Sequence, residues 1–415
     1  MKRSIFHIDA NSAYLSWTAV ELLNNGYSID IREVPAAIAG DPENRHGIIL
    51  AKSMPAKKYQ IQTGESLLEA KRKCPELITF PPDFNLYLSQ SNLMYDLLCE
   101  YSDVIERFSI DECYLDYTAS IAAFGDPVKT ANKIKERIKN ELGFTVNIGV
   151  STNKLLAKMA SEMRKPDMMH TLFPEEMLEK MWPLPVRELF FCGRATEKKL
   201  KSVGLNTIGQ VATSPLPLMQ AMLKPSMGKT IHDYANGIDD SPVSPNDEIV
   251  QKGVGNSTTT AHDVTTVQDA AKIILAISER VAGRIRKMGL CAQVVSVTVR
   301  NNELNFYRHQ MQTNHAVDTT TEIYETAMNI FKSMWRGDPI RLFGVHLGGL
   351  TVDNSRQFSI FDKTDEEKLK KIDKVVDTIR STYGESAVHR GVFTNSGTAP
   401  VQGGVNDGNY LMMKT

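Results

Sequence analysis

Two neighbouring acids interrupt an apolar run in the stretch RFSIDECYLDY, which spans residues 107–117. Successive residues of a β-strand point to opposite faces of the sheet, so a strand that continued through Asp111 and Glu112 would bury one of the two charges. Burying an unpaired carboxylate is costly. We therefore expect the chain to turn here. The turn is either a solvated hairpin or a site whose carboxylates hold a metal ion.

Composition narrows the class of protein. A length of 415 residues predicts two to four domains. The net charge is −1, so nucleic-acid binding would have to come from local basic patches. Five cysteines without CxxC spacing, and no visible secretory signal, indicate reduced thiols and a cytoplasmic protein rather than a zinc site. No apolar run approaches the roughly 18 to 20 residues of a membrane helix, so we expect no membrane association.

The first 170 residues alternate strand-like and helix-like patterns. A short apolar strand ends near Asp9, and Asn11 or Ser12 is placed to cap the helix that follows. Helices are expected at about 85–101 and 128–142, with the strand FTVNIGV after the second. This pattern predicts an α+β sheet domain with its helices on one face.

Three carboxylates would form a metal site if the strand that ends near Asp9 is a neighbour of the strands that flank the turn at Asp111 and Glu112. Asp9 would then meet Asp111 and Glu112 at one edge of the sheet. Hard divalent cations such as Mg²⁺ take oxygen ligands. Two such ions about 3.5 to 4 Å apart activate an attacking hydroxyl and stabilise a leaving oxygen in phosphoryl transfer.

A second group of charges follows in STNKLLAKMASEMRKP. Lys154, Lys158 and Lys165 fall within about 40° of one another on an ideal helix. They would form either a solvated lysine face or a basic stripe that grips a triphosphate.

Three motifs, HIDANSAY, SIDECYLDY and GVSTNKLLAKMASEMRKP, resemble the palm motifs of Y-family, translesion DNA polymerases of the bacterial type. The resemblance covers about residues 1–350. It implies an α+β right-hand polymerase with an antiparallel palm sheet plus helices, small fingers, a helical thumb and an α+β little finger. The implied boundaries are palm 1–30 and 83–173, fingers 31–82, thumb 174–240, linker 241–249, little finger 250–353 and a polar tail 354–415.

The resemblance implies roles for the palm residues. Asp9 and Asp111 match the two metal-bridging aspartates, Glu112 matches the third carboxylate, and Ala10 matches a position whose backbone carbonyl reaches a metal. Two Mg²⁺ ions are expected in the active site. Tyr14 matches the aromatic steric gate that collides with a ribose 2′-hydroxyl. Without the resemblance, Tyr14 would be interpreted as an ordinary core aromatic.

The nucleotide-binding residues match less completely. Lys165 matches the family's triphosphate-binding lysine. The fingers segment SMPAKKYQI has Met54 and Lys57 where many members carry Tyr and Arg. Lys57 supplies a point charge without the fork of Arg, and Met54 has no hydroxyl to donate.

The thumb segment FFCGRATEKKLKSVGLNTIGQVA resembles a helix-hairpin-helix, in which hairpin N–H groups meet a DNA phosphate. Gly193 occupies one hairpin glycine position, and Phe191 stands where the other glycine is usual. Lys198, Lys199 and Lys201 are further candidates for phosphate contacts, with a solvated helix face as the alternative.

The little-finger region is locally basic. Residues 249–310 hold eight Lys or Arg against four Asp or Glu. Such a surface is typical of phosphate tracking. Arg300 and Arg308 lie on or beside strands expected to face the duplex, and their contacts would position the DNA without reading bases.

The polar tail contains QFSIFD, which resembles the peptide by which bacterial polymerases hold the sliding clamp. Gln357, Phe358, Ile360 and Phe361 match that peptide. The alternative is that the apolar side chains fold back onto the little finger. One charged helix is expected at 365–383, followed by a mobile tail.

The expected function is template-directed, low-fidelity DNA synthesis that bypasses lesions during repair and damage tolerance. Its partners would be primer-template DNA, deoxynucleoside triphosphates and the sliding clamp, and the enzyme would be a monomer. A nucleotidyl cyclase also builds a two-metal site on a palm-like sheet, but it needs no thumb or little finger. A third class is a DNA-binding relative that has lost its metals, which the retained carboxylates disfavour.

Overall fold

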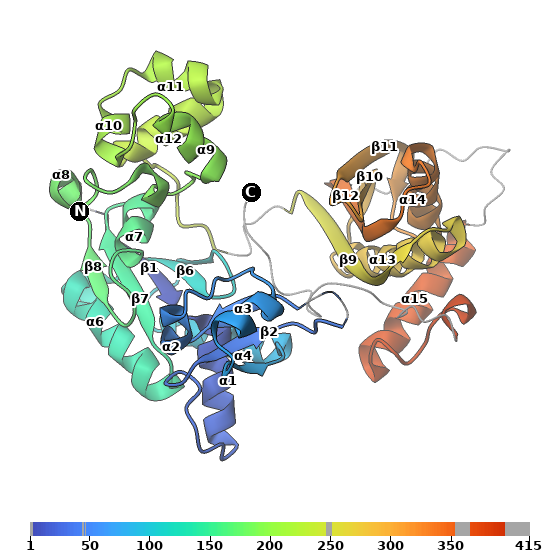
Figure 1. The fold of residues 1–415 in the computed structure, drawn as a ribbon, viewed down its shortest axis with the longest axis horizontal. Coiled ribbons are helices and arrows are strands. Elements are labelled where there is room, and N and C mark those ends of the chain that lie inside the picture. The colour runs from blue at the N-terminus through green and yellow to red at the C-terminus, as the bar shows by residue number, and fades with distance from the viewer. Residues whose placement is uncertain (1–2, 44, 46, 246–250, 353–365, 395–415) are drawn as a thin grey trace. The chain divides into compact units, whose positions relative to one another are not determined.

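The computed structural model describes residues 3–43, 45, 47–245, 251–352 and 366–394 (Figure 1). The chain forms two compact units. The first holds nearly all of the chain up to residue 249, and the second holds Gly40–Ile48 and the chain from residue 250 to residue 410. No helix among the described residues combines the length and apolar character needed to cross a bilayer.

A five-stranded sheet forms the centre of the first unit, in the order β5-β6-β1-β7-β8. All neighbours are antiparallel except β7 and β8, which are parallel. The two central strands, β1 and β7, are buried along their whole length, which explains why their sequences are almost continuously apolar. The strands are β1 (Ile5–Ala10), β5 (Ile105–Arg107), β6 (Glu112–Asp116), β7 (Val146–Ser151) and β8 (Met169–Thr171).

Several helices cover one face of this sheet, and their core includes Phe6 and Ile8 from β1, Trp17 and the large buried Tyr87. The expected capping residue is half right: Ser12 is the N-cap of α1, but its side chain makes no capping hydrogen bond. These helices are α1 (Ala13–Asn24), α4 (Phe84–Cys99) and α6 (Pro127–Arg137), which continues through the π-turn η1 (Ile138–Leu142). The short α5 (Ile121–Phe124) precedes α6.

The opposite face of the sheet is also covered, so the prediction that helices lie on one face only is wrong. Helix α7 (Lys154–Ser161) packs on β1 and β7, with Ala157 in contact with Ile5 and Tyr114. Gly149 permits this approach, because a Cβ there would lie 1.9 Å from the carbonyl oxygen of Ala157. The side chains that leave β1 toward α7 therefore end in a protein interior.

A smaller three-stranded sheet stands beside this core in sequence positions 36–80, in the order β3-β2-β4. Its own apolar cluster includes Ala37, Ile49 and Ala70. Ser53 and Ser66 cap its two helices by accepting hydrogen bonds from backbone N–H groups, as N-cap serines do. The elements are β2 (Ala36–Ala39), β3 (Ile49–Lys52), β4 (Ile78–Phe80), α2 (Met54–Lys58) and α3 (Leu67–Lys73).

The segment that follows β8 is helical and has an apolar cluster of its own, which also includes Leu155 and Met159 of α7. Helices α11 and α12 pack closely at Gly228, where a Cβ would lie 2.4 Å from the carbonyl oxygen of Met219. The elements are η2 (Pro174–Glu176), α8 (Met177–Lys180), η3 (Val186–Glu188), α9 (Arg194–Lys201), α10 (Ile208–Ala212), α11 (Leu216–Leu223) and α12 (Pro225–Ala235).

The second unit is an antiparallel four-stranded sheet, β11-β10-β12-β9, with two long helices packed on one face. Alternate residues of β10, such as Val295, Val297 and Val299, point into this core. The elements are β9 (Gly253–Val264), α13 (Val267–Lys287), β10 (Cys291–Asn301), β11 (Phe306–Val317), α14 (Thr320–Met334) and β12 (Ile340–Thr351).

A third helix of this unit, α15 (Glu366–Tyr383), confirms the expected charged helix. Ion pairs fasten it to α13: Arg286 binds Asp373 and Asp377, and the buried Glu279 binds Arg380. The chain then continues into η5 (Gly391–Phe393), where the side chain of Phe393 is buried. Most of the tail that was expected to be mobile, residues 395–415, lies outside the described residues.

Candidate active site

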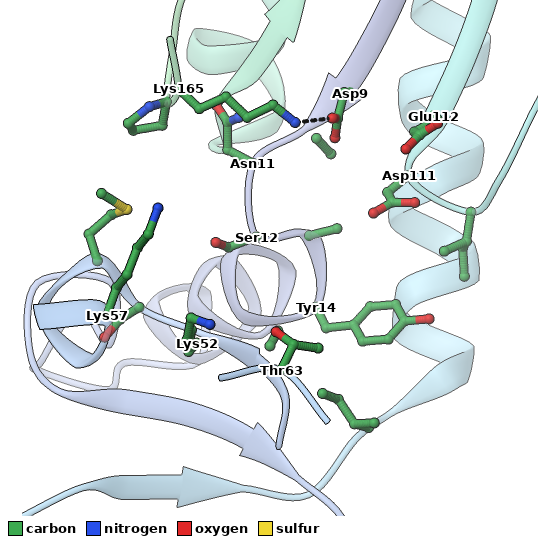
Figure 2. A pocket seen from close by; sticks show the side chains of 18 of the residues that line it. Asp9, Asn11, Ser12, Tyr14, Lys52, Lys57, Thr63, Asp111, Glu112 and Lys165 are labelled. Atoms are coloured by element: carbon green, nitrogen blue, oxygen red, sulfur yellow. Dashed lines mark hydrogen bonds and ion pairs between the residues drawn. The ribbon is translucent and has the colours of Figure 1, made fainter. Parts of the chain in front are cut away.

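The expected meeting of the three carboxylates occurs in the first unit (Figure 2). Strands β1 and β6 are antiparallel neighbours, and Asp9 pairs directly with Glu112 in their register. Directly opposite residues of a sheet point to the same face, so these two carboxylates lie together. Asp111 precedes the first residue of β6, and its backbone carbonyl accepts a hydrogen bond from the N–H of Ala10 at 2.9 Å.

This geometry resolves the problem of the adjacent acids. The chain turns at residues 108–111, and only Glu112 belongs to the strand. Asp111 therefore does not have to point away from Glu112 toward the opposite face. Both carboxylates line one cavity of about 540 Å³ together with Asp9. The chain thus turns as both interpretations require, and its two acids are partly buried in the cavity wall rather than fully solvated.

The surroundings of the three acids shift their pKa values in different directions. Burial raises the pKa of Asp9 to about 7, with the ammonium of Lys165 opposing this shift. Burial also raises the pKa of Asp111, although the hydroxyl of Ser109 donates to its Oδ1 at 2.6 Å. Burial acts in the same direction on Glu112, but hydrogen bonds and charges outweigh it and lower the pKa of Glu112 to about 2. Glu112 is therefore the most firmly ionised of the three.

The partners of Glu112 come from the strand and helix that flank it. Its Oε2 accepts a hydrogen bond from Lys158 Nζ at 2.8 Å and lies 3.3 Å from Nε2 of His7. His7 is fully buried, and its other ring nitrogen is hydrogen-bonded to the hydroxyl of Ser161 at 2.7 Å. Burial lowers the pKa of His7 to about 4. His7 was not predicted, although strand alternation places it on the same face as Asp9, two residues away.

The basic stripe predicted for Lys154, Lys158 and Lys165 is wrong. Helix α7 ends at Ser161, so Lys165 lies beyond the helix and does not share its face. Lys154 forms an ion pair with Glu106, and Lys158 forms one with Glu112. The reason is that both lysines lie in a largely buried environment, where an unpaired ammonium is costly. Of the three, only Lys165 lines the cavity.

Lys165 reaches the carboxylates directly. Its ammonium forms an ion pair with Asp9 Oδ2 and another with Glu162 Oε2 at 3.0 Å. Figure 2 shows its side chain extended toward Asp9. Oxygens of Asp9, Glu112 and Glu162 all lie within 4.8 Å of one another, an arrangement that suits a metal ion. Glu162 was not predicted, and the only sequence signal for it is its spacing of four from Lys158 and three from Lys165.

Tyr14 projects from the first turn of α1 and lines the same cavity (Figure 2). Its ring stacks on Tyr87 with centroids 4.3 Å apart and meets the edge of Phe84. The side chain is partly buried, and burial raises the pKa of Tyr14. Tyr14 therefore packs on the aromatic core, as an ordinary core residue would, and also forms part of the cavity wall.

The fingers side of the cavity is cationic. Lys57 lines it from α2, across from the carboxylates (Figure 2), and Met54 is also at the wall with its side chain exposed. Lys52, the last residue of β3, lines the cavity as well and was not predicted. Burial and the charge of Lys57 lower the pKa of Lys52. The cavity therefore has one anionic wall and one cationic wall.

The predicted hairpin lies between η3 and α9. Gly193 is the N-cap of α9, and no side chain caps the helix there. Phe191 has a φ of 68°, a left-handed conformation that glycine adopts without strain and that other residues rarely adopt. The backbone thus keeps the turn that a glycine would make. Three lysines follow on α9. Lys201 forms an ion pair with Glu197, whereas Lys198 and Lys199 form no ion pair among the described residues.

The two predicted arginines of the second unit lie on its sheet. Arg308 pairs with Thr298 in the β10–β11 register, and Arg300 is two residues further along β10. Both therefore lie on the face opposite Val297 and Val299, away from the helices. The guanidinium of Arg300 is 5.3 Å from the ring centroid of Phe306. The clamp-peptide residues Gln357, Phe358, Ile360 and Phe361 lie outside the described residues.

Comparison with known proteins identifies three matching segments. Family models match residues 8–162 (impB/mucB/samB family), 251–360 (the C-terminal domain of that family) and 191–239 (a DNA polymerase-iota thumb domain). A protein of Clostridium acetobutylicum called DNA polymerase IV is 46% identical over 393 residues, covering 94% of this chain and 98% of that protein. The DNA polymerase IV of Acetivibrio thermocellus is 39% identical over 396 residues, covering 94% and 98%.

Solved structures with low sequence identity confirm the fold. A chimeric Y-family DNA polymerase matches with a TM-score of 0.73 at 20% identity, covering 84% of this chain and 100% of that one. A Dbh ternary complex matches with a TM-score of 0.59 at 21% identity, also covering 84% and 100%. The predicted α+β right-hand fold, with palm, fingers, thumb and little finger, is confirmed. The chain therefore belongs to the impB/mucB/samB family, the Y-family DNA polymerases, among the relatives called DNA polymerase IV.

Proposed function

We propose that this Y-family enzyme copies a DNA template with low fidelity, including past lesions, and that synthesis takes place in the cavity between its acidic and cationic walls. The observation that carries the proposal is the convergence of Asp9, Asp111 and Glu112 on one cavity in a chain of this family. The reaction is DNA-directed nucleotidyl transfer from deoxynucleoside triphosphates to a primer.

The acidic wall is suited to hold divalent cations. Its ligand atoms are carboxylate oxygens, which Mg²⁺ prefers. Oxygens of Asp9, Glu112 and Glu162 lie within 4.8 Å of one another, and Asp111 lines the same cavity. We assign Asp9, Asp111, Glu112 and the backbone carbonyl of Ala10 to two Mg²⁺ ions. When bound, such ions activate the primer hydroxyl and stabilise the leaving oxygen. Lys158 and His7 hold Glu112 in one orientation while leaving its Oε1 free of hydrogen bonds from them.

The cationic wall is suited to the triphosphate. Lys57 faces the carboxylates across the cavity, and Lys165 lies next to Asp9. We assign both lysines to phosphate contacts, which need only point charges. Tyr14 lies in the wall on a rigid aromatic stack, and this position supports its assignment as the steric gate against ribonucleotides.

DNA contacts are assigned outside the cavity. The uncapped N-terminus of α9 at Gly193 offers N–H groups to a phosphate, with Lys198 and Lys199 on the same helix. Arg300 and Arg308 share the helix-free face of the second unit's sheet, which supports their assignment to the duplex backbone.

The remaining assignments concern partners and location. We propose that Gln357, Phe358, Ile360 and Phe361 bind a bacterial sliding clamp, as extended peptides bind apolar pockets. The flanking elements β12 and α15 both belong to the second unit, so this peptide is joined at both ends to one folded body. We expect the enzyme to be a monomer of the cytoplasm.

A primer-extension assay with Mg²⁺ tests the proposal. Undamaged and lesion-containing templates should both be extended when all four deoxynucleoside triphosphates are present. A nucleotidyl cyclase would release pyrophosphate from a nucleotide alone, and a metal-free DNA-binding relative would bind the primer-template without extending it. Either of those results would overturn the assignment.

A further inference from the structure

The ammonium of Lys165 lies inside the acidic cluster that is assigned to metal. It forms ion pairs with Asp9 and with Glu162, whose oxygens belong, together with that of Glu112, to the group that lies within 4.8 Å. Lys165 is therefore the counter-ion of Asp9 in this structure. Glu112 has a separate counter-ion, Lys158.

The two lysines differ in how firmly they are held. Lys158 is almost completely buried within α7, and Glu112 accepts its hydrogen bond. Lys165 lies four residues past the end of α7, and about a third of its side chain is exposed. Lys165 is thus free to swing on its flexible stem, whereas Lys158 would have to leave a buried site.

The ammonium of Lys165 cannot keep its ion pair with Asp9 when a metal-bound nucleotide occupies the cavity. A divalent cation at Asp9 and an ammonium at its Oδ2 would be like charges separated by a few ångströms in a partly buried site, where solvent screens their repulsion less than in water. A triphosphate in the cavity offers the ammonium a new anionic partner. The exchange removes the repulsion and keeps every charge paired.

We propose that Lys165 is a charge-exchange residue: it neutralises Asp9 before substrates bind and transfers to the nucleotide phosphates when a divalent cation takes its place. This inference rests on the proposed function. Its consequence is thermodynamic coupling, because the nucleotide withdraws the ammonium that competes with the cation. By linkage, each ligand then raises the affinity for the other by the same factor.

The test is binding of Mn²⁺, followed by its electron paramagnetic resonance signal, to the full-length protein without primer-template DNA. Lys165→Met should bind Mn²⁺ on the order of tenfold more tightly than the wild type in the absence of nucleotide, a coupling of ordinary size. Addition of a deoxynucleoside triphosphate should raise Mn²⁺ affinity in the wild type and have much less effect in the variant. Mn²⁺ bound by free nucleotide is measured in a protein-free sample at the same free-nucleotide concentration and is subtracted.

Lys133→Met is the control for the loss of one positive charge, since Lys133 is exposed on α6 and lies outside the cavity. This variant should bind Mn²⁺ like the wild type when nucleotide is absent. Lys165→Gln provides a second neutral substitution, and circular dichroism checks that each variant is folded. Equal Mn²⁺ affinity in the wild type and both Lys165 variants would overturn the inference. Equal tightening by Lys133→Met would also overturn it, because it would show a general effect of the lost charge. Primer extension by the wild type keeps the two proposals apart: if it succeeds while the Mn²⁺ result fails, only the charge exchange is refuted.

Discussion

Lys154→Met should destabilise the first unit severely, although Lys154 lies outside the active-site cavity. Its ammonium donates to both carboxylate oxygens of Glu106, each at 2.8 Å, and Glu106 is only 2% exposed. Oε2 of Glu106 also accepts the backbone N–H of Ser244 at 2.9 Å. The neighbouring Val243 is buried against the palm sheet. This ion pair therefore fastens the first part of the predicted 241–249 linker to the sheet.

The magnitude follows from the burial of the carboxylate. The methionine leaves Glu106 charged and buried, with the N–H of Ser244 as its remaining donor. Removing one partner of a buried ion pair costs about 3 to 5 kcal/mol. For a unit of this size, each kcal/mol lowers the melting temperature by about 2 to 4 °C, so we expect a decrease of about 6 to 20 °C.

A double-mutant cycle with Glu106→Gln isolates the interaction. The single Glu106→Gln variant should also be destabilised, because it leaves Lys154 without its anion. The double variant has no buried charge at this site and should be more stable than the sum of the two changes predicts, with a coupling of at least about 2 kcal/mol. Unfolding is followed by scanning calorimetry of the full chain.

The control is Lys133→Met, because Lys133 is an exposed lysine on α6 and its loss should change stability by less than about 0.5 kcal/mol. Amide hydrogen exchange at Ser244 provides a local measurement, since its N–H should lose protection when Glu106 is altered. If Lys154→Met lowered the melting temperature no more than Lys133→Met, or if the two changes were additive, the argument from burial would be wrong.

Three further predictions concern function. Asp111→Ala should lower kcat for primer extension by roughly a thousandfold, because it removes a proposed metal ligand from a site that supplies several kcal/mol of transition-state stabilisation. The affinity for primer-template DNA, measured by fluorescence anisotropy, should not change. Near wild-type extension would show that the site is misplaced. Tyr14→Ala should raise the relative incorporation of ribonucleotides by about tenfold or more, and an unchanged ratio of kcat/KM values would assign Tyr14 to the core alone. Replacing Phe358, Ile360 and Phe361 together with Ala should abolish stimulation by a DNA-loaded clamp and preserve unassisted extension, whereas loss of unassisted extension would indicate that these side chains fold back.

Local sequence was sufficient for most of the elements and for three of the acids that line the cavity. The helix at 366–383 and the strand at 291–301 were predictable because their side-chain periodicities are strong. Asp9, Asp111 and Glu112 could be chosen because adjacent acids in an apolar run require a turn, and because a motif surrounds each of them. Tyr14 was ambiguous from sequence, and its place in both the aromatic core and the cavity wall explains why.

Only the tertiary structure decided which charges neutralise one another. An ideal helix places Lys154, Lys158 and Lys165 on one face, but α7 ends at Ser161 and three different carboxylates take the three lysines. The partners Glu106, Glu112 and Asp9 are distant in sequence from these lysines, so periodicity carries no information about those pairs. Burial then makes each pairing obligatory, because an unpaired charge is costly in the interior.

The same reason explains the features that were missed. Helix α7 covers the second face of the sheet because Gly149 lets the two backbones approach, a contact between elements that local pattern does not reveal. Glu162 enters the acidic cluster, and α15 docks on α13 through Arg286, only once the chain has folded. The sequence by itself determined which segments are strands and helices and which acids we propose as metal ligands. The packing of those segments determined the electrostatic environment of the site, because burial and ion pairing depend on distances that exist only in the folded chain.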